Sequence, residues 1–124
     1  MRVTIQQEPD RTVVHLVGEL DALSCAAVVD EVRGAADAGP SAVVLNLRAL
    51  RFVDSTGLRA IVRISRELAR QGRKLAVSRP SAFCRSLMET VGLDRIVQIL
   101  EPDADPAVRL PESRVAAAGG GPRS

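Results

Sequence analysis

The residues of this sequence with the clearest chemical potential are three consecutive polar residues and the glycine after them, Asp54, Ser55, Thr56 and Gly57. They stand directly before a run with helical periodicity. We therefore expect them at the N-terminus of a helix, where backbone N–H groups lack partners. A cap formed by Asp54 or by Ser55 would satisfy one of these groups and contribute about 1 kcal/mol.

Capping does not account for Gly57. A glycine in the first turn of a helix costs roughly 0.5–1 kcal/mol relative to alanine, so its presence indicates that another group approaches the backbone closely. That group is either internal, such as a neighbouring strand, or external, such as a protein lying over the turn. The sequence leaves both alternatives open.

The spacing around Ser55 does not match three known kinds of catalytic or phosphate-binding site. An aspartic protease needs two such carboxylates and has glycine two residues after the aspartate, whereas Gly57 follows Asp54 by three. A nucleophile elbow requires Gly-x-Ser-x-Gly, but position 53 is valine, and a P-loop requires several glycines and a lysine. The single histidine, His15, lies in a predicted strand and is interpreted as a sheet-face residue without a role. These mismatches argue against an enzyme whose chemistry is centred on this segment.

The composition is typical of one soluble domain. The chain has 124 residues, and its 46% hydrophobic content includes only 2% aromatic residues, so the core must be aliphatic. Seventeen basic residues nearly balance 15 acidic ones. With two Phe and neither Trp nor Tyr, the chain lacks the stacking side chains of a typical nucleic-acid-binding protein.

The two cysteines, Cys25 and Cys84, do not form a CxxC pair and have no partner histidines at zinc spacing. We expect both to be buried, unlinked thiols in predicted helices, and we expect no metal site. The sequence also lacks a run of 18 to 20 apolar residues and a signal-peptide pattern at its N-terminus. The expected location is the cytoplasm.

Hydrophobic patterning in the first part of the chain predicts a β-hairpin, a helix and a buried strand. The two hairpin strands span residues 3–7 and 12–17. The helix spans 22–36, with Asp21 as its N-cap. The continuous apolar run 42–47 predicts a central strand with helices on both faces.

Helices and strands are predicted to alternate in the rest of the chain. After a connection over 48–54, the longest helix spans 55–71, and one of its sides carries four arginines, Arg59, Arg63, Arg66 and Arg70. Such a side is usually a solvated surface. The later predictions are a strand at 74–77, a helix at 80–90 ended by Gly92, a strand at 96–100 and a short helix at 103–110.

These elements predict an α/β fold, with a mixed sheet of four to five strands and about four helices. The later strands are expected to be parallel. We place the domain at residues 1–110. Residues 111–124 are rich in Ala, Gly and Pro and are expected to form a flexible tail.

Four separated motifs, 18–21 (GELD), 43–47 (VVLNL), 52–58 (FVDSTGL) and 88–93 (METVGL), occur in the order found in STAS domains. Over nearly the whole chain, the sequence resembles the stand-alone bacterial anti-sigma factor antagonists of that family. The resemblance implies a single STAS-like domain and a role in transcription regulation, such as a stress response or sporulation.

The resemblance also implies a partner-switching cycle. The unphosphorylated protein binds an anti-sigma factor that is also an ATP-binding serine kinase and so releases a sigma factor. The kinase then phosphorylates the serine after the aspartate, here Ser55, and a separate phosphatase restores it; Thr56 is the alternative acceptor. No cofactor of the protein itself is implied. The implied partner-binding residues are Asp21, Asp54, Ser55, Thr56, Gly57, Leu58 and Arg59.

Two other functions remain alternatives. A STAS subunit of a membrane transport complex would use the same fold without a phosphorylation cycle, but the Asp-Ser-Thr-Gly sequence at 54–57 favours the switch. An enzyme would need a general base or a metal site, which the sequence does not indicate.

Arg59, one turn after Ser55, is placed to reach an anion bound there.

Overall fold

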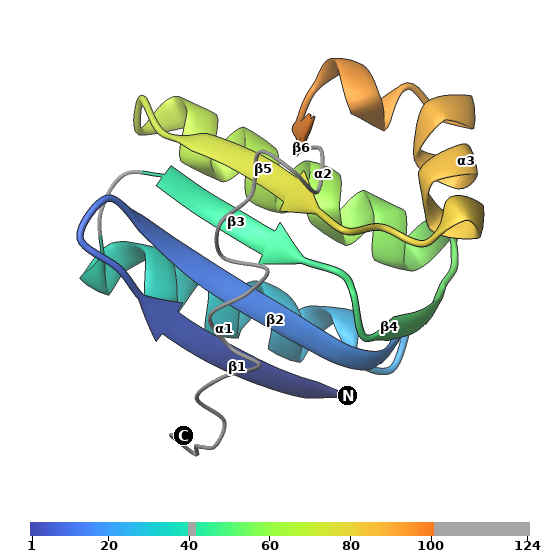
Figure 1. The fold of residues 1–124 in the computed structure, drawn as a ribbon, viewed down its shortest axis with the longest axis horizontal. Coiled ribbons are helices and arrows are strands. Elements are labelled where there is room, and N and C mark those ends of the chain that lie inside the picture. The colour runs from blue at the N-terminus through green and yellow to red at the C-terminus, as the bar shows by residue number, and fades with distance from the viewer. Residues whose placement is uncertain (40–41, 101–124) are drawn as a thin grey trace.

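The computed structural model describes residues 1–39 and 42–100, and these form an α/β fold (Figure 1). In chain order the elements are β1 (Arg2–Gln7), β2 (Arg11–Leu20), α1 (Cys25–Ala38), β3 (Ala42–Asn46), β4 (Leu50–Val53), α2 (Ser55–Arg70), β5 (Lys74–Ser78), α3 (Ala82–Thr90), the 3-10 helix η1 (Leu93–Arg95) and β6 (Gln98–Leu100).

The strands form one mixed sheet. β1 pairs antiparallel with β2, and the other strand pairs are parallel. The order across the sheet is β1-β2-β3-β5-β6, so β3 is central, as predicted, and β4 leaves this path to pair with the last part of β2. Parallel strands direct their carboxyl ends to one edge, so the segments that follow β2 and β4 lie next to each other.

The predicted hairpin is confirmed. At its turn the Glu8 backbone N–H donates to the Arg11 carbonyl at 2.8 Å, and the Arg11 guanidinium pairs with the Glu8 carboxylate at 2.9 Å. Both side chains of this ion pair are largely buried. The turn therefore fixes the register in which Thr4 opposes His15.

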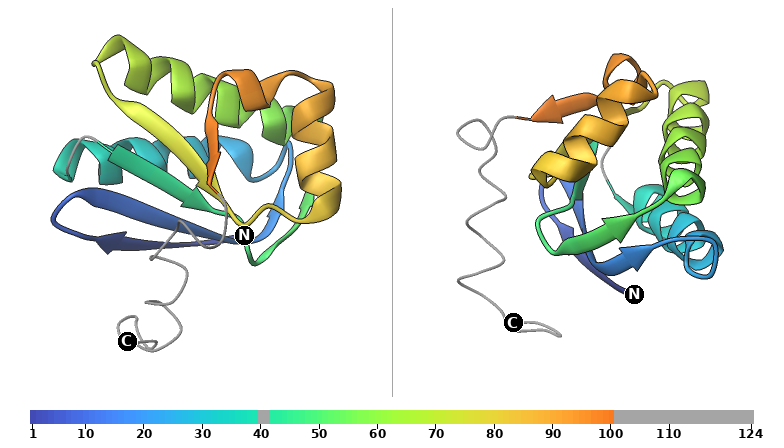
Figure 2. Two further views of the ribbon diagram at one scale, coloured as in Figure 1. Left: turned by 45° about the horizontal axis from the view of Figure 1, so that its top comes forward. Right: turned by 90° about the vertical axis from the view of Figure 1, so that its right-hand side faces the viewer.

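The core is aliphatic, as the composition predicts, and lies between the sheet and the two long helices. α1 and α2 pack side by side on one face of the sheet (Figure 2). Val14 and Leu16 of β2 enter this core, together with Val29 of α1 and Ile61 of α2. α3 contributes its buried Met88 to the same cluster.

The prediction of helices on both faces of the central strand is not met by α1 and α2, which share one face. Side chains alternate along a strand, so Val13 and Val44 point to the face opposite Val14 and Leu45. They form a separate small apolar cluster there. A continuous apolar run thus shows that both sides of a strand are buried, but it does not identify what buries them.

Helix α2 is the longest of the described helices, as predicted, and its ends follow from its sequence. Gly72 has φ +70°, a conformation that favours glycine, and the Arg73 N–H donates to the Leu68 carbonyl at 2.8 Å. This arrangement ends the helix one residue earlier than predicted. The four arginines on the outer side of α2 are all exposed.

The predicted numbers of elements need correction, because the described residues contain six strands and three α-helices. The missed strand is β4, four residues long, within the predicted connection 48–54; its pairing with β2 depends on chain geometry that periodicity does not show. The last strand is β6, which is shorter than predicted because η1 forms before it.

The predicted start of the first helix and its N-cap were wrong. α1 begins at Cys25, and Ser24 is its N-cap residue. The Asp21 carboxylate accepts hydrogen bonds from the backbone N–H groups of Leu23 and Ser24, so it caps the preceding turn. Asx turns of this kind compete with helical hydrogen bonding and delay the helix.

The predicted helix at 103–110 and the predicted tail at 111–124 lie outside the described residues. The domain boundary proposed at residue 110 lies there too. Among residues 1–39 and 42–100, no helix combines the length and hydropathy needed to cross a membrane.

Candidate functional site

The junction between β4 and α2 holds the polar residues that the sequence singles out. Asp54 has extended backbone and is the N-cap of α2, and its Oδ1 accepts a hydrogen bond from the Gly57 backbone N–H at 2.9 Å. The Leu58 N–H donates to the Asp54 carbonyl, also at 2.9 Å. Of the two candidate caps, Asp54 is therefore the one that forms.

Ser55 is the first residue of α2 and is exposed. Because Asp54 provides the cap, the Ser55 hydroxyl is not needed to complete the helix. Thr56, the alternative phosphate acceptor, is only half-exposed. Ser55 is thus more exposed to solvent than Thr56.

The group that approaches Gly57 is internal. A Cβ at this position would lie 2.4 Å from the Leu20 carbonyl oxygen and 2.7 Å from Val53 Cγ2. These distances are far shorter than any van der Waals contact, so only glycine allows the first turn of α2 to pack this closely against the end of β2. Gly57 therefore sets the position of the residues beside it.

Asp21 and Asp54 are brought together by the sheet. Leu20 and Val53 are register partners at the ends of β2 and β4, and the Asp54 N–H donates to the Leu20 carbonyl at 3.3 Å. Each aspartate therefore follows the end of one of two paired parallel strands. Each also caps the segment after it with its own carboxylate, so both acidic side chains are held in place.

The remaining predicted contact residues differ in exposure. Arg59 is exposed on α2, one turn after Ser55. Leu58 is only 5% exposed and belongs to the hydrophobic core, and Gly57 is also buried. These two residues support the surface around Ser55 from below.

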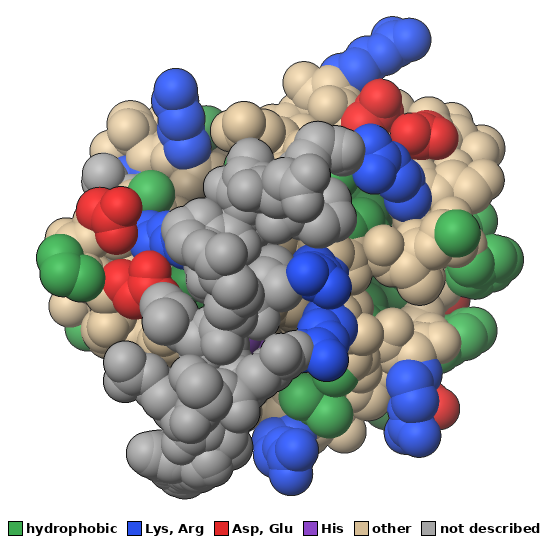
Figure 3. Space-filling model, in the orientation of Figure 1, with side chains coloured by type: hydrophobic (Ala, Val, Ile, Leu, Met, Phe, Trp, Pro, Cys, Tyr) green, Lys and Arg blue, Asp and Glu red, His purple; other side chains and the backbone are tan. Residues whose placement is uncertain are grey.

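Two exposed apolar side chains near this junction were not identified from the sequence. Leu23, two residues after Asp21, is 95% exposed, and Phe52, two residues before Asp54, is 46% exposed. Figure 3 shows apolar side chains at the surface on the side where β4 and α3 lie. The sequence contains no signal for this exposure, because leucine and phenylalanine are usually buried.

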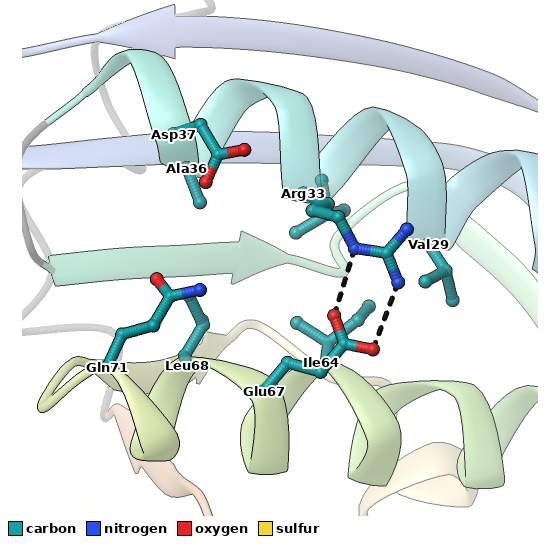
Figure 4. Close-up of a pocket in the computed structure, with 9 residues that line it drawn as sticks. Val29, Arg33, Ala36, Asp37, Ile64, Glu67, Leu68 and Gln71 are labelled. Carbon is teal, nitrogen blue, oxygen red and sulfur yellow. Dashed lines mark hydrogen bonds and ion pairs between the residues drawn. The ribbon is translucent and has the colours of Figure 1, made fainter.

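The pocket between α1 and α2 lies toward the end of α2 farther from Ser55 (Figure 4). Arg33 of α1 binds the Glu67 carboxylate through two hydrogen bonds of 2.9 Å, which hold the pKa of Glu67 below its ordinary value. The pocket has a volume of only about 20 Å³, room for roughly one water molecule. The pocket is therefore a small gap in the contact between two helices, and it is too small to bind a substrate.

The other chemically capable residues lie apart from Ser55. His15 is in β2, paired with Thr4 and Asn46, at the sheet position expected for it. Cys84 is buried in α3, where burial raises the pKa of its thiol, but Cys25 is only half-buried, so the prediction that both cysteines are buried was wrong for Cys25. The described residues contain no cluster of three potential metal ligands.

Several known proteins are similar to this chain. The chain is 26% identical over 97 residues to the anti-sigma-F factor antagonist RsfB of Mycobacterium tuberculosis, covering 78% of this chain and 79% of that protein. Its fold is similar to an anti-sigma factor antagonist from Mycobacterium paratuberculosis (TM-score 0.73, 24% identity, 87% and 93% of the two chains). It is also similar to the anti-sigma factor antagonist SpoIIAA in its unphosphorylated form (TM-score 0.68, 21% identity, 82% and 90%).

The sequence pattern of one family extends over most of the chain. The model of the STAS domain family matches residues 2–106, which include β1 to β6 and the junction at Asp54 and Ser55. The chain therefore belongs to the STAS domain family.

Proposed function

We propose that this protein is a cytoplasmic anti-sigma factor antagonist, switched off by phosphorylation at Ser55. In its unphosphorylated form it binds an anti-sigma factor that is also a serine kinase, and the bound sigma factor is released. The kinase uses its own ATP to phosphorylate Ser55, and a separate phosphatase reverses the modification. The similarity of this chain to the anti-sigma factor antagonists RsfB and SpoIIAA supports the general role.

The observation that carries this proposal is that Asp54 forms the N-cap of α2, whereas the neighbouring Ser55 is exposed and takes no part in the cap. Asp54 caps α2, so the exposed Ser55 is not needed as the cap of the helix. A kinase must reach the hydroxyl of its acceptor, and an exposed acceptor can be reached without local unfolding. Ser55 meets this requirement, and the buried Gly57 and Leu58 hold the turn rigidly beneath it.

The isolated domain is expected to tolerate a phosphate on Ser55. A phosphoryl group brings about −1.5 to −2 charges at neutral pH, and the N-terminus of a helix provides partly positive N–H groups. The Arg59 guanidinium, one turn along, is a second favourable neighbour. Under a bound partner, the same charge would be buried without a prepared counter-charge, which is strongly unfavourable.

The proposed contact surface consists of the exposed groups around this turn. Asp21, Ser55, Thr56 and Arg59 are at least partly exposed, and the half-buried Asp54 directly follows the end of β4. The exposed Leu23 adds apolar area at its edge. A mainly polar surface with a few exposed apolar side chains is compatible with a transient protein interface.

The experiment that tests the proposal is affinity capture from the native cytoplasm, followed by mass spectrometry of the protein and of what it binds. We expect a small ATP-binding anti-sigma factor in the captured fraction and a phosphate on Ser55 in part of the protein. Capture of a membrane transporter ATPase instead, with no phosphate on Ser55, would support the transport-subunit alternative and overturn the proposal.

A further inference from the structure

The outer side of α2 carries a row of positive charge that acidic side chains compensate only in part. The helix contains four arginines and a single glutamate, Glu67. Glu67 already accepts two hydrogen bonds of 2.9 Å from Arg33 of α1, and it also forms an ion pair with Arg63 at 3.5 Å. Within the described part of the chain, no ion pair engages Arg59, Arg66 or Arg70.

The row is aligned with Ser55. At 3.6 residues per turn, positions 55, 59, 63, 66 and 70 fall within an arc of about 80° on the helix surface. The rise of an α-helix places Ser55 and Arg70 roughly 22 Å apart along the axis. We call Arg59, Arg63, Arg66 and Arg70 the arginine stripe; it begins one turn after Ser55 and follows the exposed side of α2.

The stability of the helix accounts for Arg70, which lies in the last turn where the helix dipole favours a cation, but not for the stripe as a whole. Like charges three or four residues apart on a helix repel each other by roughly 0.2–0.5 kcal/mol per pair. The opposite face of α2 is buried in the core through residues such as Ile61 and Leu68, so the stripe cannot adapt by rotating the helix. Arrays of one sign on a rigid surface instead attract and orient oppositely charged partners.

We infer that the arginine stripe is a binding surface for an acidic region of the anti-sigma partner, an inference that rests on the proposed function. A partner that covers Ser55 and extends along α2 would meet the stripe over its whole length. Phosphorylation of Ser55 would place negative charge one turn from Arg59 and weaken the positive electrostatic potential at the N-terminal end of the stripe. The switch would then slow association as well as destabilise the complex.

A protein partner fits better than a nucleic acid or a membrane. The chain has no Trp or Tyr to stack on bases, and its net charge is only +2. The apolar face that a membrane-surface helix would insert is already buried in the core. Duplex DNA and anionic vesicles therefore serve as contrasting ligands in the test.

The test compares two double variants with the same change of net charge. Arg66→Glu/Arg70→Glu alters the stripe away from Ser55, and Arg2→Glu/Arg95→Glu alters two exposed arginines elsewhere. Association with the captured anti-sigma factor is followed by stopped-flow fluorescence from low salt to about 0.5 M NaCl, where the Debye length falls to roughly 4 Å. We expect the stripe variant to associate about tenfold more slowly at low salt, with the difference vanishing at high salt.

Unchanged association of the stripe variant, or equal slowing of the control variant, would overturn the inference. If wild type binds no anti-sigma factor, the proposed function fails separately, and poly-L-glutamate becomes the probe. Weaker binding of poly-L-glutamate by the stripe variant than by the control would support an acidic protein ligand, and equal binding would contradict it. Stripe-dependent binding of duplex DNA or phosphatidylserine vesicles at physiological salt would assign the stripe to those ligands instead.

Discussion

Ser55 is the residue at which a single charge is expected to decide between binding and release. Ser55→Glu should melt like wild type, because the carboxylate lies at a helix N-terminus where negative charge is favourable. In the complex, an unpaired buried charge costs about 3–5 kcal/mol, which corresponds to a loss of affinity of more than roughly a hundredfold. Calorimetric titration against the anti-sigma kinase measures this loss.

The matched control for this variant is Ser55→Ala, which removes the hydroxyl without adding charge. It should bind the kinase with an affinity close to that of wild type and accept no phosphate. If Ser55→Glu binds as tightly as wild type, or if phosphate still enters Ser55→Ala at Thr56, then Ser55 is not the switch.

The two cysteines should differ in reactivity. Cys25 is half-buried at the start of α1, whereas Cys84 is buried and its pKa is raised by burial. Because the thiolate is the reactive form, we expect Ellman's reagent to modify Cys25 well before Cys84 in the native protein. Single Cys→Ser variants identify each thiol, and equal native rates would contradict the difference in environment.

At the scale of elements, Gly57 sets the distance between α2 and β2. Gly57→Ala should lower the free energy of unfolding by about 1–3 kcal/mol, since the new methyl group would overlap the Leu20 carbonyl and Val53. Gly34→Ala is the control, because a Cβ at Gly34 in α1 meets nothing within 4 Å and should stabilise by roughly 0.5–1 kcal/mol. Urea denaturation measures both. A stabilising effect of Gly57→Ala would show that α2 shifts freely.

The elements themselves were largely predictable from periodicity. The start of α2 at Ser55 follows from the polar residues before an amphipathic run, and the hairpin of β1 and β2 from two β-prone runs around a turn. The four-residue strand β4 was missed, since its pairing with β2 is a long-range contact without a local pattern. For the same reason, the sequence left open whether the neighbour of Gly57 is internal or external.

At the scale of the whole molecule, the two long helices and the sheet enclose one aliphatic core, while the junction of β4 and α2 presents the polar surface. Both aspartates of the candidate site were predictable as residues, but their proximity was not. It depends on β4 leaving the main path of the sheet to pair with the end of β2, beside Asp21. The exposure of Leu23 was not predictable either; Leu23 lies in the turn capped by Asp21, outside both the strand and the helix.

This separation between core and surface makes Leu23 a test of the interface as a whole. Leu23 is 95% exposed, so Leu23→Ala should change the free energy of unfolding by no more than about 0.5 kcal/mol. If the partner covers the surface around Ser55, the same variant should bind the anti-sigma kinase roughly tenfold more weakly, because apolar area buried in the complex is lost.

Val91→Ala is the control, since Val91 is 57% exposed at the end of α3 and lies outside the proposed contact surface; it should affect neither stability nor binding. Titration calorimetry and thermal melts of the two variants give both quantities. Wild-type affinity of Leu23→Ala would place the partner away from the turn at Asp21, and an equal loss in Val91→Ala would show that apolar exposure alone, rather than position, determines binding.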